Sequence, residues 1–559
     1  MCNRLTQRTL DRMTRYRQAL NSLLARTGAR SYWTNIGLLR GYWSIGIVCG
    51  LLFLAGSLSA ASPAVSSNPP AGIPHTDVGD ANSSSAIPRL PRVSPDYLEV
   101  IIPPNLAPLN LVVQEQGVEY QLRVSGTRGQ SIEIRQANPQ VRFPLREWKK
   151  LLAVNRGGKL TWNIAVRSSA GDWTSYAPFE CRIAEEDIDP YILYRRFRPL
   201  YSSYKHMGIY QRHLETFEEK PVLRNETIEH GCVNCHTFQQ GSPDRFVMSF
   251  RGRFGTPTLL IDSNRVSRID TKMGYLSWHP NGKLLVFSAN AITQFFHLAG
   301  PVNRDVNDPR SDLQTFDLET RTLEKPAAIA VPDCNENWPC WAPDGRFLYY
   351  CRAPVVAFRD IPSLRYDLVR IPYDSDQKRW GEPETLVSGA ENRLSAHQPR
   401  VSPDNRFLVF TASDSGSFPL FRPESDLFLL RLDTRKSERL TINSDQAETW
   451  HSWSSNGRWM VFGSRGLDGV FARLLITHVD SDARFSKPLL LPQEDPAYYD
   501  HCLDNFNVPE LVRGPLQVSE SDLARVVLTP GSAARPAGPD VSIPGQSSDH
   551  STISDNPYE

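Results

Sequence analysis

Residues 276–287 read Leu-Ser-Trp-His-Pro-Asn-Gly-Lys-Leu-Leu-Val-Phe, and three later segments repeat this pattern. The anchor residues Trp278, Trp341, Val401 and Trp453 lie 63, 60 and 52 residues apart. Each copy predicts a strand, a tight Asn-Gly or Asp-Gly type of turn, and a second, aromatic strand. Further strand-like runs follow each copy, and four strands per repeat at this period are typical of β-propeller blades.

We therefore predict a mainly β protein with a β-propeller over residues 263–518. The four copies give four clear blades. Incomplete strand patterns at residues 246–261 and after Asn505 would complete a ring of five or six blades.

A different pattern precedes the repeats, because apolar and polar residues alternate with a period of two. Tyr120, Leu122 and Val124 form one such run, and residues 160–166 form another. Short strands at such intervals predict an immunoglobulin-like β-sandwich over residues 93–187, in which residues 145–152 form a short helical crossing.

The segment between these two regions begins with a helix-start signal. Asp189 has the form of an N-cap, and Pro190 has the form of the first helical residue. We expect one helix from Pro190 to about Arg198 and a second helical piece over residues 209–219. These helices would make a small helical haem-binding segment over residues 188–262.

The motif Gly231-Cys232-Val-Asn-Cys235-His236 lies in that segment and contains the pattern C-x-x-C-H. Two thiols three residues apart can form thioethers with the two vinyl groups of one porphyrin, and the adjacent histidine can ligate the iron. We therefore predict one covalent c-type haem, held by Cys232 and Cys235, with His236 as the proximal ligand.

Three other interpretations of the motif stay open. A structural zinc site would need four ligands, whereas the other cysteines of the exported chain are scattered at positions 181, 334, 340, 351 and 502. A thioredoxin-like redox pair would need a βαβ context. A disulfide or a pair of free thiols is the third alternative, and Cys340 with Cys351 is a further disulfide candidate.

The distal iron ligand is predicted from nearby side chains. Met207 is favoured because it follows the predicted helix, with His206 and Met248 as alternatives and an open sixth position as a fourth option. A methionine ligand would raise the reduction potential and suit electron transfer. Three arginines of the predicted helix are candidate partners for the haem propionates: Arg195, Arg196 and Arg198.

The N-terminus predicts export. Eight arginines precede an uncharged run at residues 41–61, so residues 1–61 form a signal peptide or an uncleaved signal anchor. We expect the rest of the chain to lie in the periplasm or cell envelope, with the apolar segment as the membrane anchor if it is not cleaved. Residues 62–92 are expected to be a linker and residues 519–559 a disordered tail, since both are rich in small and polar residues.

The charge of the chain is balanced, with 62 basic and 61 acidic residues. This balance argues against a nucleic-acid groove as the main activity.

Taken in order, these features resemble an uncharacterised group of bacterial exported proteins that join a c-type cytochrome motif to a TolB-like (WD40-like, PD40) propeller. The resemblance covers about residues 95–515. The segments that carry it are 188–196, 207–212 and 232–236, together with the Trp-Ser/Ala-Pro-Asp-Gly-Lys/Arg signature of the blades. It implies the haem and the propeller, and it implies no particular substrate.

The favoured function is therefore electron transfer or redox sensing by a monohaem c-type cytochrome-like protein, with the propeller as a docking scaffold for a redox or envelope protein. The sequence favours a non-enzymatic role. Two alternatives remain: an envelope-interaction protein with a structural haem, and an oxidoreductase with an active site in the propeller.

Overall fold

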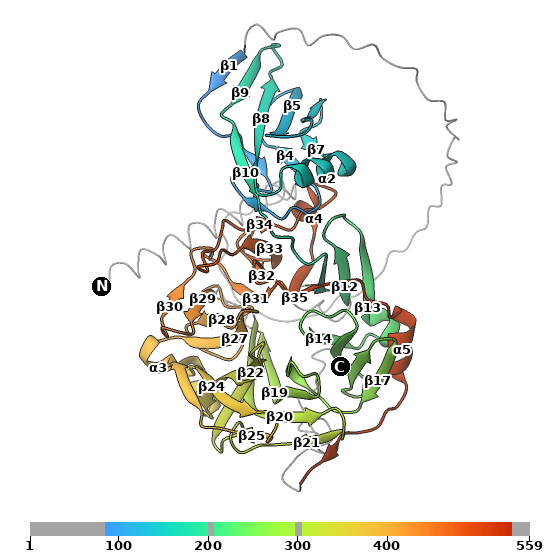
Figure 1. Cartoon of the computed structure of the whole chain (residues 1–559), viewed down its shortest axis with the longest axis vertical. Helices are drawn as coiled ribbons and strands as arrows, with labels where there is room; N and C mark the ends of the chain where they lie inside the picture. Colours follow the sequence, from blue (N-terminus) through green and yellow to red (C-terminus); the bar gives the residue numbers. More distant parts are fainter. Residues whose placement is uncertain (1–83, 199–205, 297–303, 539–559) are drawn as a thin grey trace, which may run out of the picture. The chain divides into compact units, whose positions relative to one another are not determined.

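The computed structural model describes residues 84–198, 206–296 and 304–538, and β-strands dominate these residues (Figure 1). The predicted signal or anchor segment lies outside the described residues, as does the predicted linker up to residue 83. No helix among the described residues combines the length and apolar character needed to cross a membrane.

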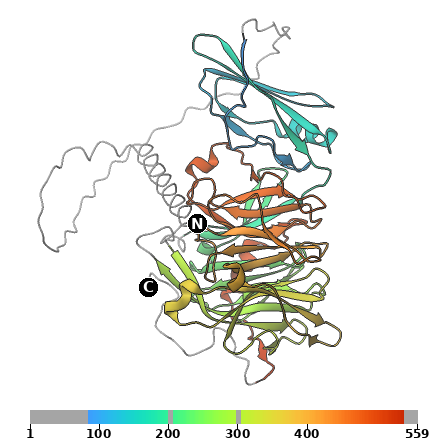
Figure 2. The same cartoon turned by 90° about the vertical axis from the view of Figure 1, so that its left-hand side faces the viewer.

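Six sheets surround a common centre, and each contributes one innermost strand (Figure 1). The innermost strands are β14 (Cys232–Phe238), β18 (Gly274–Trp278), β22 (Cys334–Trp341), β27 (Ser395–Val401), β31 (Glu448–Trp453) and β35 (Asn505–Val512). Each contacts the next, and β35 contacts β14, so the ring is closed. The described strands between Tyr191 and Val512 therefore form a six-bladed β-propeller, and Figure 2 shows its blades from the side.

The outer strands complete the blades. The blade of β35 adds β11 (Tyr191–Phe197), β12 (Met207–His213) and β13 (Glu219–Arg224), and the blade of β14 adds β15 (Arg245–Arg251), β16 (Thr258–Asp262) and β17 (Arg265–Ile269). The blade of β18 adds β19 (Leu284–Phe296), β20 (Arg304–Asp317), β21 (Thr322–Glu324) and β36 (Arg535–Pro536). The blade of β22 adds β23 (Phe347–Pro354), β24 (Asp367–Asp374), β25 (Arg379–Trp380) and β26 (Glu384–Val387). The last two blades add β28 (Phe407–Ser413), β29 (Asp426–Arg431) and β30 (Ser437–Arg439), and β32 (Trp459–Ser464), β33 (Arg473–His478) and β34 (Leu489–Leu490).

The turns of the four repeats explain their sequence. Gly282, Gly345 and Gly457 have φ values of +72°, +74° and +68°, in the left-handed region that favours glycine. In the third copy Asn405 takes this position with φ +59°, and asparagine is among the few other residues that tolerate it. The predicted hairpins are thereby confirmed.

Closure of the ring joins the two ends of the propeller sequence. β35 pairs antiparallel with β11, with Arg195 opposite Asn507 and Phe197 opposite Asn505. The strand patterns at residues 246–261 and after Asn505 therefore do supply the two remaining blades, as strands β15, β16 and β35.

The predicted helices at residues 190–198 and 209–219 are wrong, since these segments contain strands β11 and β12. Asp189 does not cap a helix: its carboxylate accepts hydrogen bonds from the backbone N–H and the hydroxyl of Ser455, at 2.7 and 2.5 Å. The cap-like signal thus reflects a contact with a distant blade. The described residues between 191 and 262 belong to two blades rather than to a separate helical segment.

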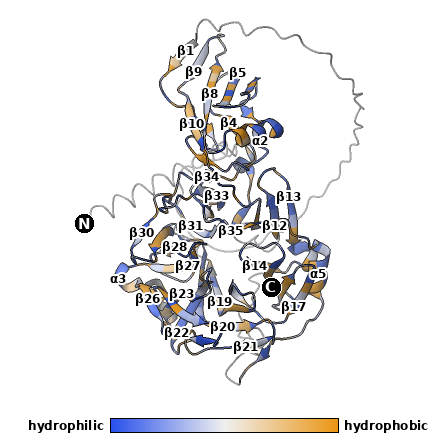
Figure 3. Ribbon diagram, in the orientation of Figure 1, coloured by the Kyte–Doolittle hydropathy of each residue, from blue (hydrophilic) through white to orange (hydrophobic). Residues whose placement is uncertain are grey.

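The region before the propeller contains two sheets and one helix. One sheet combines β1 (Ser84–Ile87), β3 (Ile101–Ile102), β5 (Glu119–Gly126), β6 (Ile132–Gln136), β8 (Lys159–Arg167), β9 (Trp173–Tyr176) and β10 (Phe179–Ile183). The other combines β2 (Val93–Ser94), β4 (Leu111–Val113) and β7 (Gln140–Val141). The helix is α2 (Leu145–Val154), at the predicted position; it buries Trp148, Leu151 and Leu152, and Figure 3 shows both apolar and polar residues on it.

Two segments predicted to lack structure are partly ordered. Strand β1 lies within the predicted linker and pairs in parallel with β9. Helix α5 (Glu520–Leu528) lies within the predicted tail, where the carboxylate of Glu520 forms an ion pair with Arg224 at 2.8 Å. The remaining tail residues, 539–559, lie outside the described part of the chain.

Four short helices connect strands elsewhere. They are α3 (Gly389–Asn392), α4 (Tyr498–His501) and the 3₁₀ helices at Asn225–Ile228 and Phe358–Ser363.

Candidate functional site

The C-x-x-C-H motif lies on β14, at the centre of the propeller. β14 pairs with β15, and the register shifts between Val233 and His236, which marks a β-bulge. In a regular strand, residues three apart point to opposite faces, so the extra residue of the bulge is what allows Cys232 and Cys235 to line the same cavity.

The same bulge recurs in other innermost strands. Tyr275, Trp338 and Trp450 occupy it in β18, β22 and β31, with φ values of +43°, +57° and +53°. Their rings meet at the centre of the ring of blades: Tyr275 stacks on Trp338 at 3.6 Å, and Trp338 meets Trp450 edge-on at 5.4 Å. Aromatic side chains thus form one wall beside Cys235.

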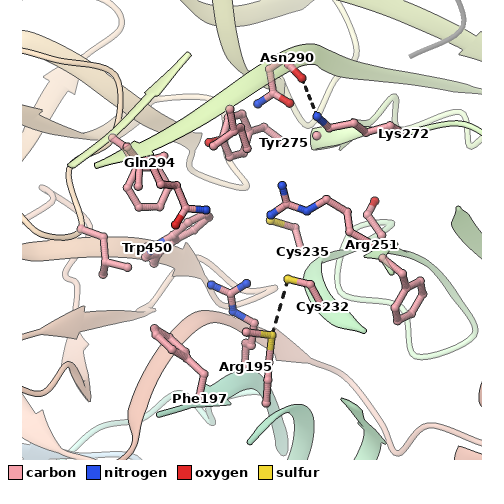
Figure 4. A pocket seen from close by; sticks show the side chains of 18 of the residues that line it. Arg195, Phe197, Cys232, Cys235, Arg251, Lys272, Tyr275, Asn290, Gln294 and Trp450 are labelled. Carbon is pink, nitrogen blue, oxygen red and sulfur yellow. Dashed lines mark hydrogen bonds between the residues drawn. The ribbon is translucent and has the colours of Figure 1, made fainter. Parts of the chain in front are cut away.

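The cavity that both thiols line is called the thiol cavity here (Figure 4). Its volume is about 100 Å³. Sites that enclose a drug-sized ligand measure roughly 300–1,000 Å³. The thiol cavity in this conformation therefore encloses a small molecule, and a porphyrin exceeds it.

His236 lies beside the thiol cavity and is 2% exposed. Among the described residues, neither of its ring nitrogens has a hydrogen-bond partner. Burial, with a contribution from the charge of Arg195, lowers the pKa of His236 to about 3. The imidazole is therefore neutral at physiological pH, which is the form that binds a metal.

Two further cavities lie close to the thiol cavity. His236 lines a small cavity of about 20 Å³ that shares Cys235, Tyr275 and Trp450 with the thiol cavity. This small cavity in turn shares Thr237, Leu276 and Arg400 with a third one of about 420 Å³, which residues of all six innermost strands line. The three cavities are therefore neighbours, and residues of the motif line two of them.

The Cys235 thiol is not activated. Burial raises the pKa of Cys235, so its sulfur is protonated at neutral pH. The Cys232 sulfur lies 3.8 Å from the Met207 sulfur. The other described cysteines are free thiols; Cys340 lies opposite Tyr349 and Cys351 opposite Asn337, so these two do not face each other across the hairpin.

The three predicted distal ligands lie in different places. Met207 lines the thiol cavity, and Met248 lies opposite His236 on the neighbouring strand, where it is buried. The side chain of His206 is 64% exposed, and its Nδ1 lies within hydrogen-bond distance of the Glu226 carboxylate, at 3.3 Å. The structure therefore brings Met207 and Met248 to the motif and places His206 at the surface.

Of the three arginines proposed for the propionates, only Arg195 lines the thiol cavity. Arg196 and Arg198 form ion pairs with Glu219 and Asp504, at 2.7 and 3.0 Å. Three other basic residues line this cavity and were not predicted: Arg251, Lys272 and Arg304.

The side chains at the motif differ from the ligand set of a zinc site and match the donors of c-type haem. The described residues contain no group of three or more His, Cys, Asp or Glu side chains placed to hold a metal ion, so the structure gives the zinc interpretation no ligand set. Two thiols on one cavity and a neutral, unpartnered histidine beside them do match the donors that c-type haem requires. The residues therefore fit the haem chemically, while the volume of the cavity does not hold the whole macrocycle.

No protein-family model matches the chain, and no curated protein matches it. Similar solved structures include a Dos1 propeller, a prolyl endopeptidase and an oligogalacturonate lyase from Vibrio parahaemolyticus, at 10%, 12% and 13% identity. Their TM-scores are 0.29, 0.31 and 0.28, and the matches cover 48%, 54% and 50% of this chain and 67%, 49% and 85% of theirs. The chain thus spans about half the length of the endopeptidase. Because these scores are low, the propeller assignment depends on the sheets described above.

Proposed function

We propose that the chain binds one c-type haem covalently through Cys232 and Cys235, with His236 as an iron ligand. The observation that carries the proposal is the meeting of two thiols on one cavity with a buried, neutral imidazole that has no hydrogen-bond partner among the described residues. A hydrogen-bonded histidine would be held by the protein, whereas this one keeps both nitrogens available.

The chain's own residues have distinct tasks in this proposal. The two thiols anchor the group, and His236 supplies a nitrogen ligand. Tyr275 and Trp450 form an aromatic wall beside Cys235, and Arg195 offers positive charge for a carboxylate. The haem, when bound, supplies one-electron chemistry.

We further propose that the protein is an exported electron-transfer or redox-sensing protein of the periplasm or cell envelope, of the TolB-like propeller type, with an immunoglobulin-like sandwich before the propeller. The cavity of about 420 Å³ supports a docking role, because residues of all six innermost strands line it, among them the three repeat tryptophans Trp278, Trp341 and Trp453. Aromatic residues are enriched at protein interfaces. The partner would be a redox or envelope protein.

The test is a pyridine haemochrome spectrum and an intact mass of the full chain, produced by export in cells that attach c-type haem. We expect a c-type spectrum and the added mass of one haem. Cys232→Ala together with Cys235→Ala should abolish both signals, while the matched thiol variant Cys334→Ser should retain both. A colourless, folded wild-type protein at the unmodified mass refutes the proposal.

One observation favours a second candidate. Cys232 and Met207 place two soft sulfur atoms 3.8 Å apart on a cavity of about 100 Å³ that Cys235 also lines. Thiolate and thioether ligands select soft ions such as Cu(I). Elemental analysis of the same preparation distinguishes the two, since iron accompanies haem and copper would replace it in this case.

A further inference from the structure

A second group of polar side chains lines the thiol cavity, across from Cys232. Figure 4 shows Tyr275, Asn290 and Lys272 on this side, with Arg251 beside them. We call these four residues the polar wall. They come from β15, from the segment before β18, and from β18 and β19, so the wall joins two neighbouring blades.

Two members of the polar wall carry buried polar atoms without partners. Tyr275 is 9% exposed and Asn290 is 5% exposed. Among the described residues, the Tyr275 hydroxyl and both amide atoms of Asn290 have no partner with hydrogen-bond geometry, although the Asn290 amide lies close enough to Asp308 to lower the pKa of that carboxyl. Buried polar atoms are hydrogen-bonded in the great majority of cases, so three such atoms on one cavity point to a polar ligand.

The charge of the cavity indicates the sign of that ligand. Four basic side chains line it, Arg195, Arg251, Lys272 and Arg304, and its described lining contains no Asp or Glu. The Lys272 ammonium is held in place by the backbone carbonyl of Asn290, at 2.8 Å. An anion would therefore meet fixed donors rather than mobile surface charges.

One buried carboxyl, Asp308, lies near the wall. Burial raises the pKa of Tyr275, and the charge of Asp308 raises it further. Burial raises the pKa of Asp308 to about 7. Four neighbouring side chains have the opposite, smaller effect and lower this pKa: Lys272, Asn290, Asn337 and Arg251. Asp308 is therefore partly protonated at neutral pH and opposes an anion less than an ordinary carboxylate would.

We propose that the polar wall binds a small oxyanion, of the size of nitrite or sulfite. The cavity volume of about 100 Å³ lies below the roughly 300–1,000 Å³ of sites that enclose drug-sized ligands, which favours a small oxyanion over a nucleotide or a sugar phosphate. Every group that carries this proposal is a side chain of the protein. Two of them, Tyr275 and Arg195, are also assigned to the proposed haem site, so the test is made with and without the haem.

The carboxylates of a porphyrin are also anions that the polar wall could bind. The experiment therefore has to distinguish a free oxyanion from these carboxylates. Nitrite, sulfite and phosphate are titrated by calorimetry into the full chain, both as exported and as the haem-free variant Cys232→Ala with Cys235→Ala. We expect at least one of the three anions to bind both forms.

Two substitutions test the wall itself. Tyr275→Phe removes one hydroxyl and should weaken binding about tenfold, as expected for the loss of a hydrogen bond to a charged group. The matched variant Tyr373→Phe, on an outer strand away from the cavity, should bind like wild type. Lys272→Met should weaken binding by at least as much, whereas Lys283→Met, at the β18–β19 turn, should not.

The results that overturn the proposal are specific. Failure of both forms to bind any of the three anions refutes it, as does unchanged binding by Tyr275→Phe. Binding by the haem-free variant alone would assign the wall to the porphyrin carboxylates and also refute it. If the exported wild-type protein proves to carry no haem and still binds an anion, the result would support the polar wall while refuting the proposed function.

Discussion

At the scale of single residues, His236 decides the chemistry of the site. It is buried, neutral and without a hydrogen-bond partner among the described residues. We predict that His236→Ala retains the covalent haem, because both thiols remain, but loses the absorption spectrum of the wild-type iron ligation. The spectrum and the intact mass of the exported variant check this.

The matched control is His451→Ala on β31. His451 is equally buried, with a pKa lowered to about 3 by burial, but its ring bonds the Val409 carbonyl at 2.8 Å. Its removal should leave the spectrum unchanged. A shared spectral change in both variants would mean that His236 acts only through packing.

Asp308 gives a pH-dependent prediction at the same scale. Its folded pKa of about 7 lies above the ordinary value near 4, so between these pH values the folded state holds a proton that the unfolded state releases. Its contribution to the free energy of unfolding therefore falls as pH rises toward 7, by about 1.4 kcal/mol per pH unit at most. Asp308→Asn removes this loss.

We thus expect Asp308→Asn to raise the melting temperature more at pH 8 than at pH 5. Thermal denaturation of wild type and Asp308→Asn at both pH values measures the difference in melting temperature. The effects of all other titrating groups cancel in this difference, because both proteins contain them. The exposed Asp414→Asn serves as the control and should show no such pH dependence. Equal gains at the two pH values would contradict the buried charge of Asp308.

At the scale of elements, helix α5 is the clearest test of order in the C-terminal segment. Leu523 is fully buried, whereas Leu528 on the same helix is 38% exposed. Leu523→Ala should lower the free energy of unfolding by about 2–5 kcal/mol, because it leaves a cavity. Leu528→Ala should cost much less, and denaturant titration compares the two. Equal and negligible losses in the free energy of unfolding would instead support the prediction of a disordered tail.

The sequence predicted the elements whose pairing is local. Four blades follow from the repeats, since each hairpin forms within one copy and its turn needs glycine or asparagine at a positive φ. Strands β11 and β12 were missed because Asp189-Pro190 imitates a helix start while Asp189 actually binds Ser455. The partner of β11 is β35, about three hundred residues away in sequence, and no local pattern reports that pairing.

The residues of the site likewise fall into those that the sequence predicts and those that it does not. Cys232, Cys235 and His236 were found because their spacing is itself the signal. Lys272 and Asn290 were not, since only closure of the ring brings them to the thiol cavity. Tyr275 could have been noticed three residues before the repeated tryptophan Trp278, but the bulge that turns it inward is not visible in the sequence.

At the scale of the whole molecule, stability depends on β35. It pairs with β11 and contacts both neighbouring innermost strands. A chain that ends at residue 504 would leave the ring open, so we expect its propeller to lose cooperative unfolding. A chain that ends at residue 538 keeps every described element and should melt like the full protein. Tryptophan fluorescence during denaturation compares them, and a cooperative transition in the shorter chain would contradict this dependence.

The same strand has a consequence for how the protein is made. Cys232 and His236 are nearly inaccessible once the blades surround them, and β35, the strand that completes the circle, is the last of the innermost strands to leave the ribosome. A bulky prosthetic group would have to be installed while the circle is open. Export, attachment of the prosthetic group and pairing of β35 would then have to occur in that order. A chain whose β35 pairs before attachment would fold without the prosthetic group.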